Sequence, residues 1–174
     1  GDEAFPYGLN VTGKPTRPRG WIHFLDFTDL ENPVESARYQ VPEAGTHNLW
    51  IEDGVMYVAY YNAGLRAVDV TGELMGDLYR QGREIAWFLP THPKGVVPNA
   101  PMVWGPQPYK GKIFFSDWNS GLWCVELVEG CLAGAGIKAE QIKHPGHRNR
   151  SAKGVGDLAR LSRGAVAAGS PDRI

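Results

Sequence analysis

Short runs of apolar residues, many of them aromatic or β-branched, alternate along the chain with polar turns. The clearest example spans residues 54–70 (GVMYVAYYNAGLRAVDV), where two such runs, 55–61 and 65–70, are separated by Asn-Ala-Gly. Strand-favouring runs bounded by Asn and Gly predict a β-hairpin. The same reasoning predicts further strands over residues 21–27, 34–41, 47–51, 102–104, 113–117 and 122–127. The segment 78–88 carries charges and predicts either a strand with a polar face or one helical turn.

An internal repeat relates three of these strands. The segments GWIHFLD, GLRAVD and GLWCVE begin at Gly20, Gly64 and Gly121, and each ends in an acidic residue. The second and third copies also share a lead-in, because residues 57–62 (YVAYYN) align with residues 114–119 (FFSDWN). Gly64 follows Gly20 by 44 positions. A period near that length with four short strands is typical of β-propeller blades.

A resemblance to a known family is carried by these and neighbouring motifs. The segments FLDFTDLENP (24–33), THN (46–48), YVAYYNAGLRAVD (57–69) and FSDWNSGLW (115–123) resemble the LVIVD-repeat β-propeller proteins of bacteria. The resemblance covers residues 20–127 and implies an exported propeller, with no catalytic residues to carry over. The chain also resembles proteins of gemmatimonad bacteria. That likeness implies an accessory subunit on the outer face of a membrane complex, with a photosynthetic reaction-centre complex as one candidate.

The propeller that this resemblance implies is incomplete. About nine strands are expected, which is two blades and a fraction, whereas a closed propeller contains about 4–8 four-stranded blades. We therefore expect an all-β fold with a partial propeller of two to three antiparallel blades over residues 20–131. An extended arm at 1–19 precedes it, and a basic, mostly irregular tail at 132–174, with one short helix at 157–168, follows it. Uncovered blade edges and faces are association sites, so a partner is expected to cover them.

Charge is distributed unevenly along the chain. Residues 1–131 carry 10 Lys and Arg against 16 Asp and Glu, a net charge of −6, whereas residues 132–174 carry 8 against 3, a net charge of +5. A basic tail on an acidic body predicts binding to a protein or lipid-headgroup surface, and a solvated tail is the alternative. Nucleic acid is not expected as a partner, because no aromatic residues are interleaved with the basic ones.

Candidate partner-binding residues lie in three segments. The arm contributes two aromatic residues, and the tail contributes basic and apolar residues. The Pro-rich insertion at 89–101 lengthens the second repeat interval, and insertions of this kind often form contact loops. The candidates are Phe5, Tyr7, His92, Lys94, Arg148, Arg150, Lys153, Leu158, Arg160, Leu161 and Arg163.

The two cysteines and the start of the sequence bear on the compartment. Cys124 and Cys131 are close enough in sequence to form a disulfide in an exported protein, or else Cys124 is a small core residue of a strand. No apolar run approaches the ~18–20 residues needed to span a bilayer. The sequence starts at Gly1, so removal of a leader and removal of Met alone are both open. We expect a periplasmic protein peripheral to the membrane.

No motif predicts a reaction, because the sequence contains no G-x-S-x-G, no G-x-G-x-x-G and no C-x-x-C-H. His47 precedes a strand, which favours a backbone hydrogen bond over a ligand role. The repeated acids Asp26, Asp69 and Glu126 predict the same local hydrogen bond in each copy. A His-x-x-His pair in the tail encloses Pro-Gly, and this spacing does not predict a metal site.

These features together predict a non-catalytic structural or interaction subunit without a cofactor. It would dock on the extracytoplasmic face of a larger complex and stabilise it by binding other protein subunits. One alternative is a ligand- or metal-binding propeller enzyme fragment, with a site built from His23, His47, Asp69 and Asp117. The other is a self-assembling module, in which copies of the chain close a ring.

Overall fold

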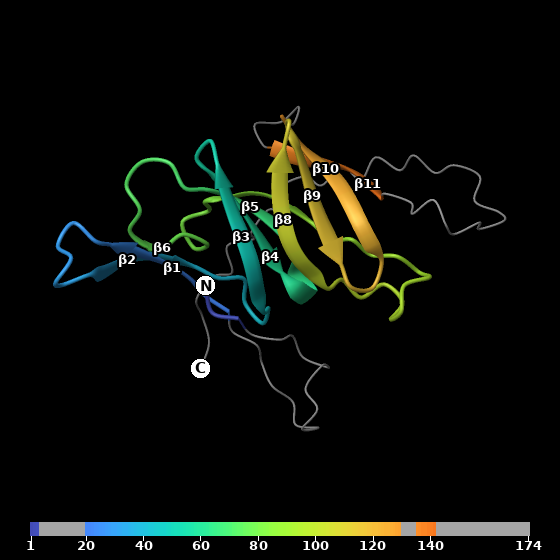
Figure 1. Ribbon diagram of the computed structural model, residues 1–174, viewed down its shortest axis with the longest axis horizontal. Coiled ribbons are helices and arrows are strands. Elements are labelled where there is room, and N and C mark those ends of the chain that lie inside the picture. The colour runs from blue at the N-terminus through green and yellow to red at the C-terminus, as the bar shows by residue number, and fades with distance from the viewer. Residues whose placement is uncertain (4–19, 130–134, 142–174) are drawn as a thin grey trace, which may run out of the picture.

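The computed structural model describes residues 1–3, 20–129 and 135–141, which form eleven strands and one short 3-10 helix (Figure 1). The elements are β1 (Ile22–Asp26), β2 (Val34–Tyr39), β3 (Thr46–Glu52), β4 (Val55–Tyr60), η1 (Tyr61–Ala63), β5 (Gly64–Asp69), β6 (Gly76–Asp77), β7 (Glu84–Phe88), β8 (Val103–Tyr109), β9 (Lys112–Asp117), β10 (Gly121–Glu129) and β11 (Ala135–Gln141). The all-β class that the sequence predicts is confirmed for this part of the chain. It holds no helix with the length and apolar character required to traverse a bilayer.

The strands form three sheets, which we name by their order in the chain. The N-terminal sheet has the order β1-β2-β6, the central sheet β3-β4-β5-β7, and the C-terminal sheet β11-β10-β9-β8. The central and C-terminal sheets are antiparallel throughout, whereas β6 pairs with β2 in parallel. In Figure 1 the N-terminal and C-terminal sheets lie at opposite ends, with the central sheet between them. The described strands do not close into a complete propeller.

The central sheet is buried on both faces. Its strand β4 therefore reads as a nearly continuous apolar run, since alternate side chains enter two different cores. The core shared with the N-terminal sheet comprises Ile22, Ala37, Tyr39, Val41, Ala44, Met56, Val58, Tyr60, Ala63, Val68 and Leu78. The core shared with the C-terminal sheet comprises Ala59, Leu65, Ala67, Ala86, Phe88, Val103, Ile113, Phe115, Trp123 and Val125. Each large side chain buried in this way contributes about 1.5–3 kcal/mol, so both interfaces are substantial.

The internal repeat corresponds to equivalent strands of two sheets. The shared lead-in forms β4 and β9, the second strands of the central and C-terminal sheets, and the motif that follows forms β5 and β10, the third strands. Two asparagines at the aligned position have the same role. Asn62 Nδ2 donates to the carbonyl of Glu43 (3.0 Å) in the loop that leads into β3, and Asn119 Oδ1 accepts from the Val97 N–H (3.2 Å) in the loop that leads into β8. Each asparagine thus ties its sheet's second strand to the entry of the first.

Several elements differ from the sequence-based expectation. The segment 78–88 contains a turn followed by strand β7, and the two-residue strand β6 was not expected. Strand β8 continues through Pro106 and Pro108, which an edge strand tolerates because their missing N–H groups face no neighbouring strand. Strand β11 lies within the segment predicted to be irregular, and it extends the C-terminal sheet. The predicted arm and tail helix lie outside the described residues.

Candidate partner-binding groove

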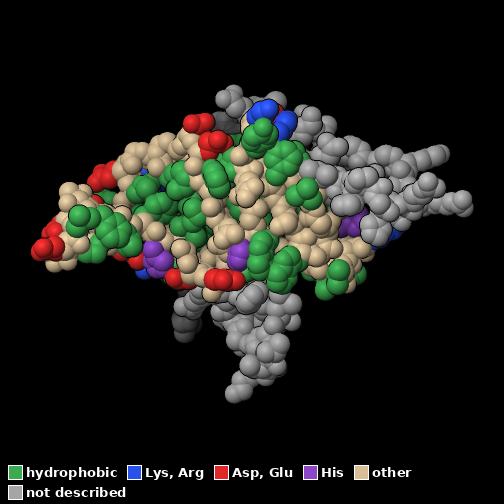
Figure 2. Space-filling model, in the orientation of Figure 1, with side chains coloured by type: hydrophobic (Ala, Val, Ile, Leu, Met, Phe, Trp, Pro, Cys, Tyr) green, Lys and Arg blue, Asp and Glu red, His purple; other side chains and the backbone are tan. Residues whose placement is uncertain are grey.

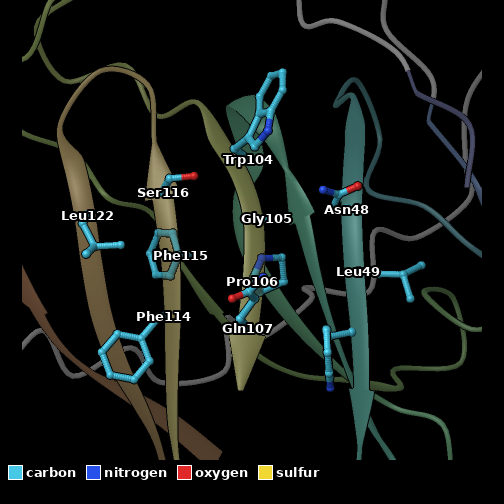
Figure 3. A pocket seen from close by; sticks show the side chains of 11 residues that line it. Asn48, Leu49, Trp104, Gly105, Pro106, Gln107, Phe114, Phe115, Ser116 and Leu122 are labelled. Atoms are coloured by element: carbon cyan, nitrogen blue, oxygen red, sulfur yellow. The ribbon is translucent and has the colours of Figure 1, made fainter. Parts of the chain in front are cut away.

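A groove opens between β3 and β8, the first strands of the central and C-terminal sheets (Figure 3). These two edge strands lie side by side without pairing, so their side chains form the walls. The groove has a volume of about 450 Å³ and continues over β9 and β10. Its lining residues are Asn48, Leu49, Trp50, Trp104, Gly105, Pro106, Gln107, Phe114, Phe115, Ser116 and Leu122.

Gly105 on β8 lies next to Asn48 on β3 (Figure 3). A Cβ atom at this position would lie 3.4 Å from both the Cβ and the Nδ2 atom of Asn48. That separation is ordinary van der Waals contact, so an alanine at this position would touch Asn48 without displacing it. Only a larger side chain would occupy part of the groove.

The chemical character of the groove is apolar and aromatic with a few neutral polar groups. Its eleven lining residues include no acid, no base and no cysteine. The side chains of Trp50 and Leu122 are about half exposed, at 49% and 45%. The amides of Asn48 and Gln107 can donate to and accept from a bound chain. Such a surface can bind an apolar segment and orient it by hydrogen bonds, and its one hydroxyl, that of Ser116, has no acid or base beside it among the lining residues.

An aromatic cluster lies next to the groove and joins the two sheets. The ring centroids of His47 and Trp104 are 3.8 Å apart, and those of Trp104 and Trp118 are 4.3 Å apart in a stacked arrangement. Tyr61 lies at 5.4 Å from His47, and its hydroxyl donates to the carboxylate of Glu3 (2.9 Å). Burial and this hydrogen bond raise the pKa of Tyr61, so its hydroxyl remains a proton donor.

His47 is held in this cluster by its ring nitrogens. Its Nδ1 lies 2.6 Å from the carbonyl oxygen of Trp104, an acceptor, so Nδ1 carries the proton. Its Nε2 lies 3.7 Å from the carboxylate of Glu3. The sequence predicts a backbone hydrogen bond within the histidine's own sheet, whereas this bond goes to the neighbouring sheet and links β3 to β8 at one end of the groove.

Two of the three repeated acids make the same turn. Asp26 Oδ1 accepts from the N–H (2.8 Å) and hydroxyl (2.6 Å) of Thr28, and Asp69 Oδ1 accepts from the same groups of Thr71 at the same distances. These hydrogen bonds lower the pKa of both carboxyls. Glu126 differs, because its carboxylate binds the ammonium of Lys112 on the neighbouring strand β9. The repeated acids are therefore local structural groups.

The four residues of the predicted ligand or metal site do not come together. His23 lies on β1, His47 on β3, Asp69 at the end of β5 and Asp117 at the end of β9. Each is engaged in contacts of its own neighbourhood, and Asp117 is buried in the turn between β9 and β10. In the described residues no group of three or more His, Cys, Asp or Glu side chains is placed to hold a metal ion.

His23 fastens the first residues of the chain to the N-terminal sheet. Its Nε2 lies 3.1 Å from Asp2 Oδ2, and its Nδ1 lies 2.6 Å from Glu35 Oε2. The hydrogen bond to Asp2, followed by that to Glu35, raises the pKa of His23 above its ordinary value of 6.5. The protonated imidazole, which can donate from both nitrogens, is therefore favoured in the folded state.

This contact predicts a pH-dependent contribution to stability. Because the folded pKa is raised, the contribution of His23 is fully present below pH 6.5 and is lost as the pH rises through the folded pKa. We expect the difference in the free energy of unfolding between wild type and His23→Gln, measured by urea denaturation, to shrink as the pH rises above 6.5 and through the folded pKa. His92→Gln is the control, since His92 faces no described carboxylate. A difference that stays constant with pH would contradict this account.

The predicted partner-binding residues fall in very different places. His92 and Lys94 lie in the loop before β8, where the Lys94 N–H donates to His92 Nδ1 (3.1 Å). The same loop exposes Val96 and Val97. Cys124 is half-buried in β10. Cys131, its partner in the predicted disulfide, lies outside the described residues. So do the remaining partner-binding candidates, namely Phe5, Tyr7, Arg148, Arg150, Lys153, Leu158, Arg160, Leu161 and Arg163.

The groove residues themselves were not among the sequence-based candidates. Asn48 and Gly105 are 57 positions apart, and only Asn48 belongs to one of the resemblance motifs, THN (46–48). The repeat gave an indirect indication of where the groove lies. Strand β3 precedes one copy of the repeat and β8 precedes the other, so the two strands have equivalent places in neighbouring sheets. Comparison of the chain with protein-family models, with curated proteins and with solved structures finds no match. The LVIVD-repeat resemblance therefore stays a prediction.

Proposed function

We propose that this chain is a non-catalytic interaction subunit that docks on the extracytoplasmic face of a larger membrane complex and stabilises it. The observation that carries the proposal is the open, apolar groove between β3 and β8. It is lined without ionisable groups and exposes large side chains that a partner can cover. A photosynthetic reaction-centre complex is one candidate for the larger assembly.

The arrangement of the sheets supports a partial propeller as the scaffold. The central and C-terminal sheets each contain one copy of the repeat, and their first strands (β3 and β8) and last strands (β7 and β11) lie next to each other. Neighbouring blades around a central channel have this relation. Strand β1 has the repeat position of β5 and β10, so the β1–β2 hairpin takes the place of the last two strands of a further blade.

The outer face of the C-terminal sheet is where we place the partner. The main described contacts of the C-terminal sheet are with strands of the central sheet and with η1. In a closed ring, a following blade would cover the other face, where Phe114 and Leu122 line the groove. We infer that another subunit supplies this cover, and that binding removes the exposed apolar area from water.

The test is recovery of the native complex with a groove variant. Leu122→Glu places a charge on the groove wall, whereas Met75→Glu makes the same kind of change at a residue that is 61% exposed in the loop before β6. We expect Leu122→Glu to reduce the amount of co-purifying partner by about thirtyfold, equivalent to a hot-spot loss of ~2 kcal/mol. The Met75→Glu variant should recover the partner as wild type does.

Two results would overturn the proposal. One is equal recovery of partner subunits with Leu122→Glu, Met75→Glu and wild type. The other is a native mass spectrum in which the chain purified from its own cells is a solitary monomer. A homo-oligomer in that spectrum would also contradict the proposal and would favour a self-assembling ring over a hetero-complex.

A further inference from the structure

The β1–β2 hairpin projects at the end of the molecule opposite the C-terminal sheet (Figures 1 and 2). Every residue from 25 to 35, which we call the hairpin surface, is exposed. Figure 2 shows hydrophobic and acidic side chains gathered there. The exposed apolar residues are Leu25, Phe27, Leu30 and Val34, with Leu30 at 80%. A cluster of this kind in a short turn marks a contact surface.

The hairpin surface is acidic and lacks a compensating cation. It contains Asp26, Asp29, Glu31 and Glu35 and no Lys or Arg. Glu35 binds His23, whereas the other three form no ion pair with a described lysine or arginine. Four carboxylates elsewhere in the described chain have a lysine or arginine partner within 4 Å, whereas others, such as Glu52 and Asp53, resemble the hairpin acids in this respect. Those pairs are Arg66–Glu84, Arg80–Asp77, Arg83–Asp69 and Lys112–Glu126.

The carboxylates also hold the hairpin surface in one shape. Asp29 Oδ1 accepts from the N–H of Glu31 (3.0 Å), and its Oδ2 accepts from Asn32 Nδ2 (2.9 Å). Asp26 binds Thr28 in the same manner. These hydrogen bonds order a turn that no other described element covers. A surface ordered before binding loses little conformational entropy when its occupant arrives.

The balance of charge identifies the chemistry of that occupant. The described residues contain 17 Asp and Glu against 8 Lys and Arg, a net charge of −9. The other residues contain 10 Lys and Arg against 2 Asp and Glu, a net charge of +8, which together give the chain total of −1. Residues 142–174 hold seven of those ten cations and both of the acids, a net charge of +5, together with apolar residues such as Leu158 and Leu161. An acidic, apolar surface and a basic, partly apolar segment are complementary.

We propose that the basic C-terminal segment of this same chain, residues 142–174, docks on the hairpin surface. Arginines and lysines of the segment pair with Asp26, Asp29 and Glu31, and its leucines cover Leu30 and Phe27. The inference does not rest on the proposed function, because the groove is a different surface at the other side of the central sheet.

The length of the segment permits this contact. The last described residue, Gln141, ends β11 in the C-terminal sheet. A chain of this size has a diameter of about 40 Å, and the 19 residues from there to Arg160 reach at most ~65 Å when extended. Tethering raises the effective concentration of the segment to the millimolar range, well above that of a second copy in dilute solution. Docking within one chain is therefore favoured over exchange between chains.

Carbodiimide cross-linking of the full chain at low ionic strength tests the contact directly. This reagent joins carboxylates to amines at zero length. Lys143 lies two residues after Gln141 and cannot reach the hairpin surface, whereas Lys153, twelve residues after it, reaches ~40 Å when extended. We expect cross-links from Lys153 to Asp29 and Glu31, at least tenfold above those to Glu52 and Asp53. The latter pair lies in the equally exposed turn between β3 and β4 and is the control. In an equal mixture of ¹⁴N and ¹⁵N protein, the cross-linked peptides should be of one isotope only.

Each other outcome overturns the proposal. Mixed-isotope peptides would assign the segment to a second copy, and cross-links spread evenly over Glu52 and Asp53 would indicate non-specific attraction. Absence of any cross-link to the hairpin surface would show that the C-terminal segment does not dock there, and a different protein would then have to be its occupant. All three are independent of the groove variants, so failure here does not affect the proposed function.

A charge exchange provides a second, matched test. Reversing the hairpin with Asp29→Lys and Glu31→Lys should reduce cross-linking of Lys153 to Asp26 and Glu35 at least tenfold. Adding Arg160→Glu and Arg163→Glu should restore at least half of the lost cross-linking yield. The new glutamates would pair with the lysines introduced on the hairpin, so opposite charges would again face each other. The control variant, Glu52→Lys with Asp53→Lys, should leave the yield unchanged. Failure of the exchanged pair to restore the cross-link would exclude a direct contact.

Discussion

Replacing Gly64 by alanine is expected to destabilise the protein by about 4 kcal/mol or more, enough to leave little folded material. Gly64 opens β5 at a φ of 82° and a ψ of −157°, a conformation that is essentially restricted to glycine. A Cβ atom there would lie 2.2 Å from the carbonyl oxygen of Phe88 and 2.9 Å from Leu89 Cδ2. Relief would require β5 to separate from β7 where Leu65 pairs with Phe88. Urea denaturation followed by tryptophan fluorescence measures the loss.

Gly121→Ala is the matched control for this prediction. Gly121 has the same repeat position in the C-terminal sheet and a φ of 95°, but a Cβ atom there would meet no atom within 4 Å. The free energy of unfolding of this variant should fall only by the cost of placing alanine at a positive φ, about 1–3 kcal/mol. Equal losses at Gly64 and Gly121 would show that backbone strain alone matters and that the contact with Phe88 does not.

Replacing Asp117 by alanine is expected to cost about 3–5 kcal/mol. The carboxylate is 2% exposed and accepts from the N–H groups of Met102 (2.5 Å), Asn119 (2.9 Å) and Ser120 (2.7 Å), and from the Ser120 hydroxyl (2.8 Å). Alanine would leave these donors in the turn without their acceptor. The same denaturation experiment measures the effect, and Asp117→Asn should lie between wild type and alanine because one oxygen is kept.

Asp69→Ala serves as the comparison for the second prediction. Asp69 accepts from Thr71 in a turn that water reaches, and its ion pair with Arg83 spans 3.8 Å. Water can replace the lost acceptor, so the expected cost is about 1 kcal/mol. If the two alanine variants lose stability equally, burial of Asp117 is not the source of its importance.

Local features of the chain were predictable from the residues alone. The run in β4, the turn that follows it and the strand β5 are neighbours in sequence, and their alternation and Asn-Gly boundary were sufficient to place them. The shared turn of Asp26 and Asp69 was also predictable, because a repeated acid two residues before a threonine makes the same local hydrogen bond wherever it recurs.

Features that depend on distant pairing were not predictable. Strand β6 consists of two residues whose strand character comes only from pairing with Ala37 and Arg38. Strand β11 contains Ala, Gly and Lys, which have weak strand preference, and it exists by pairing with the apolar β10. The groove needs Asn48 and Gly105 to face each other, and that relation follows from the packing of two sheets.

The short strand β6 has a mechanical consequence. The chain leaves the central sheet after β5, pairs with β2 of the N-terminal sheet, buries Leu78 between the two and returns as β7. A load applied to the hairpin is therefore transmitted through backbone links as well as through side-chain packing. The N-terminal and central sheets are therefore expected to move together as one body when the hairpin is displaced.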